Sequence, residues 1–252
     1  MRRYSSPSHV TYTFGPGPLS FAIKALIWAN AATFVIGMLV PEIGLFLARF
    51  LALVPAAILD RLFIWQPVTY LFLHDGPLHL LFNMLALWMF GTDLERTWGT
   101  RFFLRYYFVT GIGAAATTIL LSLAPLPFAD LLYYTPTVGA SGAIYGLLLA
   151  YGLSFPNRPI YLYLLFPIPA RVFVLIMGAI ALLSSISGGG SNIAHSAHLG
   201  GLVVGYVYLT MRRGNPLGGL KYRYTKMRMN QLRRKFEVHS GGRGDDWEKR
   251  VH

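Results

Sequence analysis

Six apolar stretches of 15 to 23 residues constrain the fold of this chain more than any other feature of its sequence. They run from Phe21 to Val40, Leu78 to Thr92, Phe102 to Ala124, Ser141 to Phe155, Val172 to Ser187 and Ile193 to Met211. Crossing the hydrocarbon core of a bilayer takes about 20 helical residues, and somewhat fewer where protein shields the helix ends. With 54% hydrophobic and 13% charged residues, the sequence therefore predicts an all-α membrane protein, a bundle of six transmembrane helices.

The uneven distribution of charge along the sequence predicts that the chain has three parts. Twelve of the 22 Lys and Arg residues follow the last apolar stretch, whereas the apolar body carries only eight. We expect a cytoplasmic N-terminal segment at 1–20, a six-helix domain at 21–211 and a basic cytoplasmic tail at 212–252. The net charge of +12 would suit nucleic acid, an acidic substrate or an anionic membrane surface. Because no folded domain remains to carry a basic surface once the apolar stretches are set aside, we expect membrane lipids and no nucleic acid as partners.

The basic residues also predict the orientation of the bundle. With six crossings, most of them gather on one side, which by the positive-inside rule is the cytoplasm. The other side receives only Arg49 and Arg61, balanced by Glu42, Asp60 and Asp130. Both termini are therefore expected in the cytoplasm. No small-residue cleavage site clearly ends the first apolar stretch, so we interpret it as an uncleaved signal anchor.

Two segments outside the apolar stretches also suit a membrane. The connection from Pro41 to Pro77 is too long and too apolar for a solvated loop, and its Trp65 and Tyr70 suit the interface, so we expect this first loop to be partly embedded in the outer leaflet. The tail segment 221–235 has apolar residues at roughly helical spacing among basic ones. It is predicted either as an amphipathic helix on the membrane surface or as a solvated basic tail that only enforces the topology.

Strongly polar residues inside the apolar stretches are few, and each is costly in a membrane. They are His79 and Asn83 in the second stretch, Ser141 at the start of the fourth, and His195 and His198 at the start of the sixth. These three stretches run in the same direction, from outside to inside, so the polar residues are expected at one depth in one leaflet. The absence of cysteine excludes disulfides, thiolate catalysis and zinc bound by cysteine.

Small residues surround Ser141 in the run Gly139-Ala-Ser141-Gly-Ala-Ile-Tyr145-Gly146, which would let a substrate carbonyl approach. At the start of a helix, free backbone N–H groups and the helix dipole would stabilise a developing oxyanion. The fourth stretch spans only about 22 Å at 1.5 Å per residue, against a hydrocarbon core of about 30 Å. Ser141 is therefore expected below the outer surface, in a cavity that water can enter.

Glycine spacing predicts which two helices meet. Gly142 and Gly146 are four residues apart, as are Gly201 and Gly205, and small residues at this spacing let membrane helices approach closely. This glycine seam is expected to bring Ser141 within reach of His198. A serine nucleophile needs such a base, and neutral imidazole is the natural one.

The remaining polar residues are expected to support this pair. Since His79 and Asn83 are i and i+4 on one helical face, both are expected to donate hydrogen bonds to an oxyanion beside the Ser141 amide. Tyr145, one turn after Ser141, is expected to pack on the His198 ring. His195 is interpreted as a residue that lines the cavity. His74 and Asp75, just before the second stretch, are interpreted as residues that cap or anchor that helix.

At these residues the sequence resembles the rhomboid family of intramembrane proteases. The resemblance rests on His79-Leu-Leu-Phe-Asn83 with Met84, on the Gly139 to Gly146 run, and on Ala197-His198-Leu-Gly-Gly201, and it extends over about residues 20–210. It implies a six-helix fold, a Ser/His dyad, no metal or other cofactor, and cleavage of single-pass transmembrane proteins near their outer ends. It also implies a bacterial inner membrane as the location.

Carried over to this chain, the resemblance makes Ser141 the nucleophile and His198 the base, with His79, Asn83 and the Ser141 amide in the oxyanion hole. Gly139, Gly142, Gly201 and Tyr145 are the supporting residues. The family usually carries Trp-Arg in the first loop, where this chain has Trp65-Gln66.

Two alternative functions belong to other classes. An inactive rhomboid-like protein would bind transmembrane clients without cutting them, and the presence of both Ser141 and His198 argues against it. A small proton-coupled transporter would use the membrane histidines, but the two halves of the sequence show no inverted repeat.

Overall fold

The computed structural model describes residues 15–162, 166–186 and 192–212, together with Met229. The chain divides into a compact unit that ends at Leu209 and a second unit that begins at Thr210, and almost all of the described residues belong to the first. In chain order the described elements are α1 (Phe21–Leu39), α2 (Pro41–Leu51), α3 (Pro55–Arg61), α4 (Gln66–Thr69), the 3₁₀ turn η1 (Tyr70–Phe72), α5 (Pro77–Ala86), the π-helical turn η2 (Leu87–Gly91), α6 (Thr92–Trp98), α7 (Thr100–Ser122), α8 (Ala129–Tyr134), α9 (Ser141–Ser154), β1 (Pro159–Leu162), β2 (Phe166–Pro169), α10 (Ala170–Ile186) and α11 (Asn192–Arg212).

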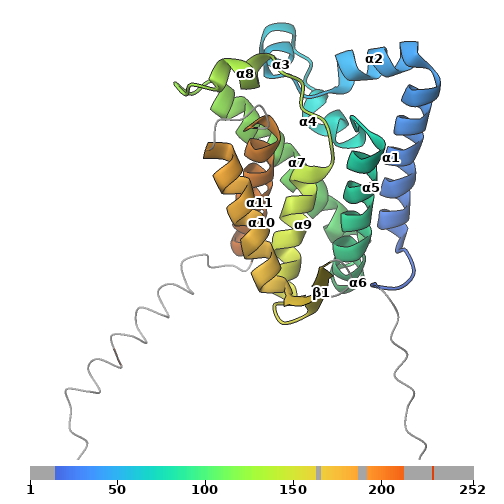
Figure 1. Ribbon diagram of the computed structural model, residues 1–252, viewed down its shortest axis with the longest axis vertical. Helices are drawn as coiled ribbons and strands as arrows, with labels where there is room; N and C mark the ends of the chain where they lie inside the picture. The colour runs from blue at the N-terminus through green and yellow to red at the C-terminus, as the bar shows by residue number, and fades with distance from the viewer. Residues whose placement is uncertain (1–14, 163–165, 187–191, 213–228, 230–252) are drawn as a thin grey trace, which may run out of the picture. The chain divides into compact units, whose positions relative to one another are not determined.

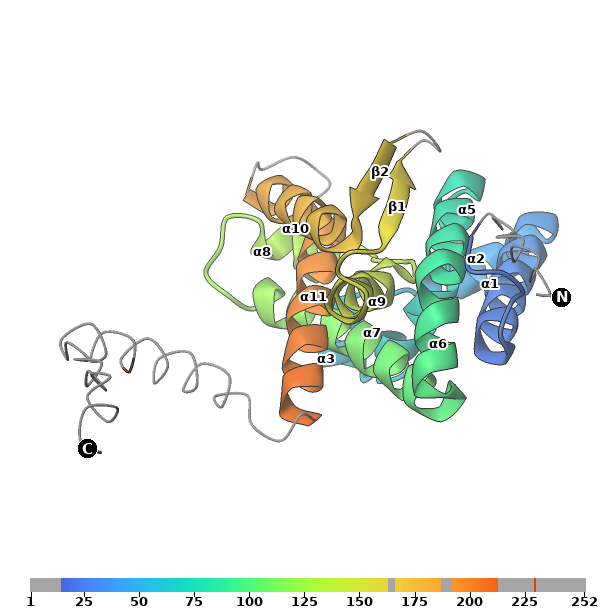
Figure 2. The ribbon, with the colours of Figure 1, turned by 90° about the horizontal axis from the view of Figure 1, so that it is seen from below.

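The long helices of the first unit run side by side and alternate in direction along the chain, as Figures 1 and 2 show for α1, α5 with α6, α7, α9, α10 and α11. Helices α2, α3 and α8 lie at one end of this unit, and α6 and the strands β1 and β2 lie at the other. The N-terminal ends of α5, α9 and α11 are consequently directed toward the same end of this unit.

Five of the six predicted apolar stretches coincide with helices to within two residues at each end. The second differs, because the helix that starts at Pro77 continues through η2 and α6 to Trp98, whereas the sequence predicted an end at Thr92. The charged residues of α6 lower the local hydropathy, so the hydropathy of the sequence did not indicate that the helix continues. Within the described residues, α1 and α7 are long and apolar enough to cross a bilayer, while α9 and α10 are apolar but shorter.

Prolines begin several of the short helices. Pro41, Pro55 and Pro77 each occupy the first position of a helix, where the missing N–H would have no partner and the fixed φ already suits the helix. The residue before each of them has an extended backbone, as the proline ring requires. The sequence predicted this region as a single embedded loop and did not anticipate its division into helices.

The first loop is fastened to itself by polar side chains. Gln66 is fully buried, and its Oε1 accepts the Val54 amide at 3.0 Å while its Nε2 donates to the Phe50 carbonyl at 3.3 Å. Trp65 donates its indole N–H to the same carbonyl at 2.8 Å, and Thr69 donates to the Leu51 carbonyl at 2.8 Å. Gln66 thus anchors the first loop, at the position where the resemblance to the rhomboid family implies arginine.

Glu95 joins the start of α1 to the end of α6. Its carboxylate, on a side chain only 4% exposed, accepts hydrogen bonds from the hydroxyls of Ser20 and Thr100 and from the amides of Ala22 and Ile23. The carboxylate therefore serves as the N-terminal cap that α1 lacks at Ser20 itself.

A β-hairpin that the sequence analysis did not predict connects α9 to α10. Strands β1 and β2 pair antiparallel, from Pro159 opposite Pro169 to Leu162 opposite Phe166. Pro156 follows the end of α9 closely and helps to stop that helix. The sequence of β1 and β2 is short and mostly apolar. Such a pattern does not distinguish a strand from the start of the next helix.

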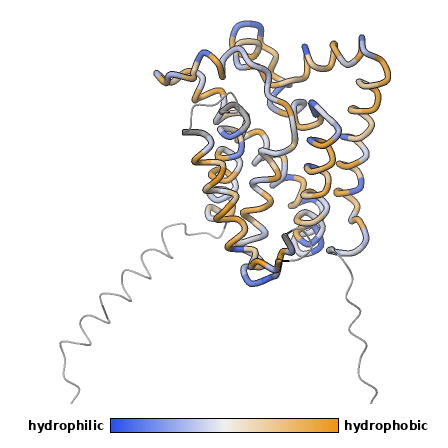
Figure 3. Tube along the Cα trace, in the orientation of Figure 1, coloured by the Kyte–Doolittle hydropathy of each residue, from blue (hydrophilic) through white to orange (hydrophobic). Residues whose placement is uncertain are grey.

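Large apolar side chains are exposed on the outer helices of the first unit. On α1, Phe21, Trp28 and Leu39 are 76%, 69% and 69% exposed, and on α10 Leu175 is 72% exposed. Figure 3 shows hydrophobic residues along most of the length of both helices. Water-soluble monomers rarely expose apolar surface on this scale, whereas a surface that faces lipid does.

Candidate active site

The starts of α9 and α11 bring Ser141 and His198 together. Ser141 is the first residue of α9, and His198 lies in the second turn of α11. The distance from Ser141 Oγ to His198 Nε2 is 2.8 Å, and both residues are half-buried. This is hydrogen-bond distance between a hydroxyl donor and an imidazole acceptor, the geometry that proton transfer from serine to histidine requires.

The His198 ring is held flat against Tyr145. The two ring centroids lie 4.2 Å apart with an angle of 8° between the planes, so the rings are stacked. Tyr145 stands one turn after Ser141 on α9, which means that one helix supplies both the hydroxyl and the surface on which the imidazole rests. Stacking restricts the orientation of His198 and directs its Nε2 toward Ser141.

Glycines allow α9 and α11 to approach this closely. A Cβ atom on Gly201 would lie 1.9 Å from the carbonyl oxygen of Gly142, and one on Gly205 would lie 3.3 Å from the Cα of Gly146. The helices therefore cross with almost no side chain between them. On its other side, Gly142 faces α7, where a Cβ would meet that of Ala114 at 2.6 Å.

Gly139 forms the turn that leads into α9. Its φ of +117° lies in a region that L side chains rarely adopt. A Cβ at this position would also come within 2.7 Å of His79 Nε2, so the imidazole of α5 lies directly against the turn. Glycine is consequently required here both by the backbone conformation and by the neighbouring ring.

His79 and Asn83 lie on one face of α5. Asn83 is buried, and its Nδ2 donates to the His79 carbonyl of its own helix at 2.8 Å. An amide nitrogen carries two hydrogens, so Asn83 retains one N–H for a further acceptor. The position of His79 against Gly139 places its ring beside the turn that precedes the Ser141 amide.

Two further histidines lie near these residues. The ring of His195 is 5.7 Å from that of His198, in an edge-to-face arrangement, and the ring of His74 is 4.9 Å from that of His79. Burial lowers the pKa of His74 to about 4; the nearby His79 lowers it too, while Asp75 opposes the shift. His74 is therefore neutral at physiological pH.

Asp75 makes a contact that the sequence analysis did not foresee. Its carboxylate lies 2.5 Å from Nδ1 of His79 in the first turn of α5. The only signal in the sequence was the spacing of four residues between Asp75 and His79, which is also common in helices without functional meaning.

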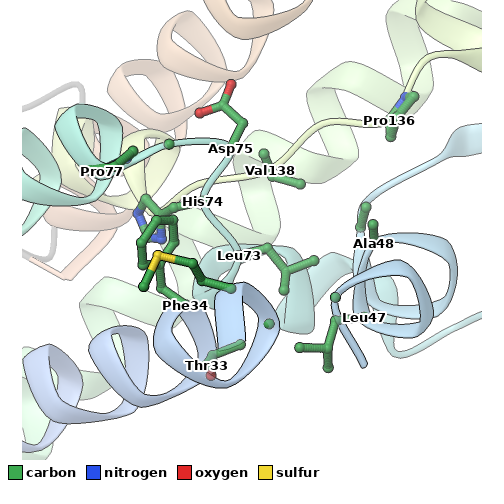
Figure 4. Close-up of a pocket in the computed structure, with 15 residues that line it drawn as sticks. Thr33, Phe34, Leu47, Ala48, Leu73, His74, Asp75, Pro77, Pro136 and Val138 are labelled. Carbon is green, nitrogen blue, oxygen red and sulfur yellow. The ribbon is translucent and has the colours of Figure 1, made fainter. Parts of the chain in front are cut away.

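An apolar pocket of about 560 Å³ lies beside these residues, between α1, α2 and the chain segments before α5 and α9. Figure 4 shows His74 and Asp75 on its wall, together with Phe34, Leu47 and Val138. Ser141 and His198 do not line it. Within the part of the chain that the structure describes, no group of three or more His, Cys, Asp or Glu side chains is arranged to hold a metal ion.

Comparison with known proteins identifies relatives of this chain. Residues 61–215 match the family model of the Rhomboid domain. Rhomboid protein 1, mitochondrial, of Saccharomyces cerevisiae is 32% identical over 193 residues, which are 74% of this chain and 51% of that protein. The Rhomboid protease GluP of Bacillus subtilis is 35% identical over 144 residues, 56% of this chain and 25% of GluP.

The Rhomboid protease AarA of Providencia stuartii is 32% identical over 156 residues, which are 56% of this chain and 53% of AarA. The chain thus spans between a quarter and about half of the length of these three relatives. Since the family model covers more than half of the 252 residues and includes the starts of α5, α9 and α11, the chain belongs to the rhomboid family.

Proposed function

We propose that this protein is an intramembrane serine protease that hydrolyses peptide bonds in or near the transmembrane segments of other membrane proteins. The observation that carries the proposal is the distance of 2.8 Å between Ser141 Oγ and His198 Nε2, at the common end of helices that expose apolar side chains. Two of the relatives described above bear the name of rhomboid protease, which supports the same activity.

In this proposal the chain crosses the membrane six times, through α1, the stretch from α5 to α6, α7, α9, α10 and α11. The alternating direction of these helices supports it, as do their exposed apolar side chains. Both termini are then cytoplasmic, and α2, α3 and α8 lie at the outer side. The short α9 fits because its start lies inside the unit, so Ser141 would open into a cavity below the outer surface. A bacterial inner membrane stays a prediction.

The reaction follows from the geometry of the pair. His198 Nε2 accepts the proton of Ser141 as Oγ attacks the scissile carbonyl carbon, and the carbonyl oxygen becomes an oxyanion. The Ser141 amide, His79 and Asn83 are the proposed donors to this oxyanion. When the intermediate collapses, the carbon–nitrogen bond breaks and the leaving amine takes the proton from His198. Water, deprotonated by His198, then hydrolyses the acyl enzyme and restores Ser141.

Labelling with a fluorophosphonate tests the nucleophile directly. Detergent-purified wild type is expected to react, while Ser141→Ala and His198→Ala are not, as seen on one fluorescent gel. The same three proteins are then incubated in proteoliposomes with a single-pass transmembrane substrate, which only the wild type is expected to cut. Folded wild type that neither reacts nor cuts, but captures the uncut substrate equally well with Ser141→Ala, would favour the client-binding function instead.

A further inference from the structure

The reaction proposed above assigns no role to the contact between Asp75 and His79. The Asp75 carboxylate is 2.5 Å from His79 Nδ1, which makes it the partner of one ring nitrogen. Asp75 belongs to the loop between η1 and α5, and His79 to the first turns of α5. The carboxylate oxygen Oδ1 of Asp75 is thus engaged with the imidazole near the start of α5.

The other ring nitrogen faces the turn before Ser141. His79 Nε2 lies where a Cβ on Gly139 would approach to 2.7 Å. The imidazole is thus held between a carboxylate at Nδ1 and, at Nε2, the glycine turn that leads to the Ser141 amide. Such a carboxylate partner fixes the orientation of a histidine ring and determines which nitrogen carries a proton.

From this geometry we infer that Asp75 is a positioning residue, which holds His79 so that Nε2–H donates to the oxyanion. The inference rests on the proposed protease function. A neutral ring that donates Nδ1–H to Asp75 has no proton on Nε2, so donation to the oxyanion requires the doubly protonated ring. Asp75 and His79 therefore act as an ion pair, and a charged donor binds an oxyanion more strongly than a neutral one.

The surroundings assign this role to Asp75. His74 also faces the ring, at 4.9 Å between centroids, but burial keeps the pKa of His74 at about 4 and its ring neutral. From α11, His198 interacts electrostatically with His79, and His195 lies beside His198; neither brings a negative charge. The side chain of Asp75 is 72% exposed, and exposed ion pairs contribute little to folding stability. Its removal should therefore affect catalysis and leave folding unchanged.

The test is a double-mutant cycle between Asp75 and His79, measured as kcat and KM for a transmembrane substrate in proteoliposomes. For histidines that bind metals, loss of the hydrogen-bonded outer partner typically costs about 10- to 100-fold in activity, and we expect a loss of the same order for an oxyanion donor. Asp75→Ala is expected to lower kcat by that factor, with KM and the thermal unfolding temperature unchanged. Asp75→Asn should retain more activity, because its amide can donate to Nδ1 and leave a neutral Nε2–H donor. In His79→Ala, the further change Asp75→Ala should alter kcat less than about twofold.

Asp130→Asn is the matched control, since it removes an exposed carboxylate from α8 at the same end of the unit, and it should behave as wild type. An unchanged kcat in Asp75→Ala, or an equal loss with and without His79, would overturn the positioning role. Wild-type activity in Asp75→Asn would overturn the ion pair. Nitrogen-15 NMR of the His79 ring in the Ser141→Ala background detects the contact with Asp75 independently of activity. If the ring-nitrogen chemical shifts were the same after Asp75→Asn, the ion pair would also be overturned. Failure of the proposed protease function would be recognised separately, because the wild type would then cut the substrate no faster than Ser141→Ala.

Discussion

Substituting alanine for Gly201 tests whether the close approach of α9 and α11 is what holds Ser141 beside His198. A Cβ on residue 201 would lie 1.9 Å from the Gly142 carbonyl oxygen, whereas ordinary van der Waals contact begins at about 3.4 Å. The opposing atom belongs to the backbone and cannot rotate away as a side chain can. The two helices must therefore separate by about 1.5 Å at this level, the difference between these distances.

Such a separation acts directly on the reacting pair, because Ser141 precedes Gly142 and His198 lies one turn before Gly201. A shift of about 1.5 Å would lengthen the present Oγ to Nε2 distance of 2.8 Å beyond the range of a hydrogen bond. Misplacement of catalytic groups by about 1 Å can cost about 100-fold in rate. We therefore expect Gly201→Ala to lower kcat at least about 100-fold.

The assay is cleavage of a fluorescent transmembrane substrate in proteoliposomes, accompanied by thermal unfolding. Gly178→Ala is the matched control, since a Cβ at this glycine of α10 would lie 3.6 Å from the Leu202 side chain and has room. Gly205→Ala imposes a milder clash, 2.5 Å from the Tyr106 hydroxyl and 3.3 Å from the Gly146 Cα, and should give an intermediate loss. If Gly201→Ala cut the substrate as fast as Gly178→Ala, the argument from close approach would be wrong.

Three other contacts lead to predictions. Aromatic pairs contribute about 0.5–1.5 kcal/mol, so Tyr145→Ala should lower kcat by up to about tenfold while Tyr145→Phe, which keeps the ring on His198, should not. The Glu95 carboxylate accepts four hydrogen bonds, three of them from residues at the start of α1. Glu95→Gln, which leaves only one acceptor oxygen, should therefore reduce the unfolding temperature at pH 7. Gln66→Ala should cost about 1–3 kcal/mol of stability in thermal unfolding, because it leaves the Val54 amide without its acceptor, and Gln66→Asn should not restore it because its side chain is shorter.

The helices and the meeting of α9 with α11 were predictable because their signals are local and periodic. Apolar stretches long enough to be helices are visible in the sequence, and glycines four residues apart mark one helical face. Once Gly142 and Gly201 are paired, the placement of Ser141 and His198 follows from the helical repeat. Their distance of 2.8 Å needed the structure, because small rotations of either helix would move the side chains by several ångströms.

The first loop and the hairpin after α9 were not predictable in detail. Of the short helices that begin at proline, α3 has too few residues to show a clear period, whereas α2 is amphipathic but has an apolar composition that resembles part of a span. The same ambiguity hid β1 and β2. The extension of the second helix through α6 was missed because Asp93 and Glu95 lower the hydropathy there, although both are engaged in contacts within the protein.

Gln66 illustrates how a departure from a family pattern is resolved by packing. An arginine offers only donors, whereas the position occupied by Gln66 needs an acceptor for the Val54 amide and a donor for the Phe50 carbonyl. A primary amide supplies both. The side chain is fully buried, and a neutral group costs less to bury than a charge. Gln66 therefore anchors the loop with a neutral amide that both donates and accepts.

Asp75, in contrast, has a contact near the candidate site that its sequence position did not predict. Its spacing of four residues from His79 was visible, but so was its place just before a helix, where an acidic residue ordinarily serves the helix N-terminus. The extended backbone of Gly76, with φ of −171° and ψ of 164°, separates Asp75 from the helical repeat. Only the folded chain shows that the carboxylate turns back to Nδ1 while Nε2 meets Gly139. The orientation of a single ring then links an exposed loop acid to the turn that carries Ser141, a coupling that no periodic pattern encodes.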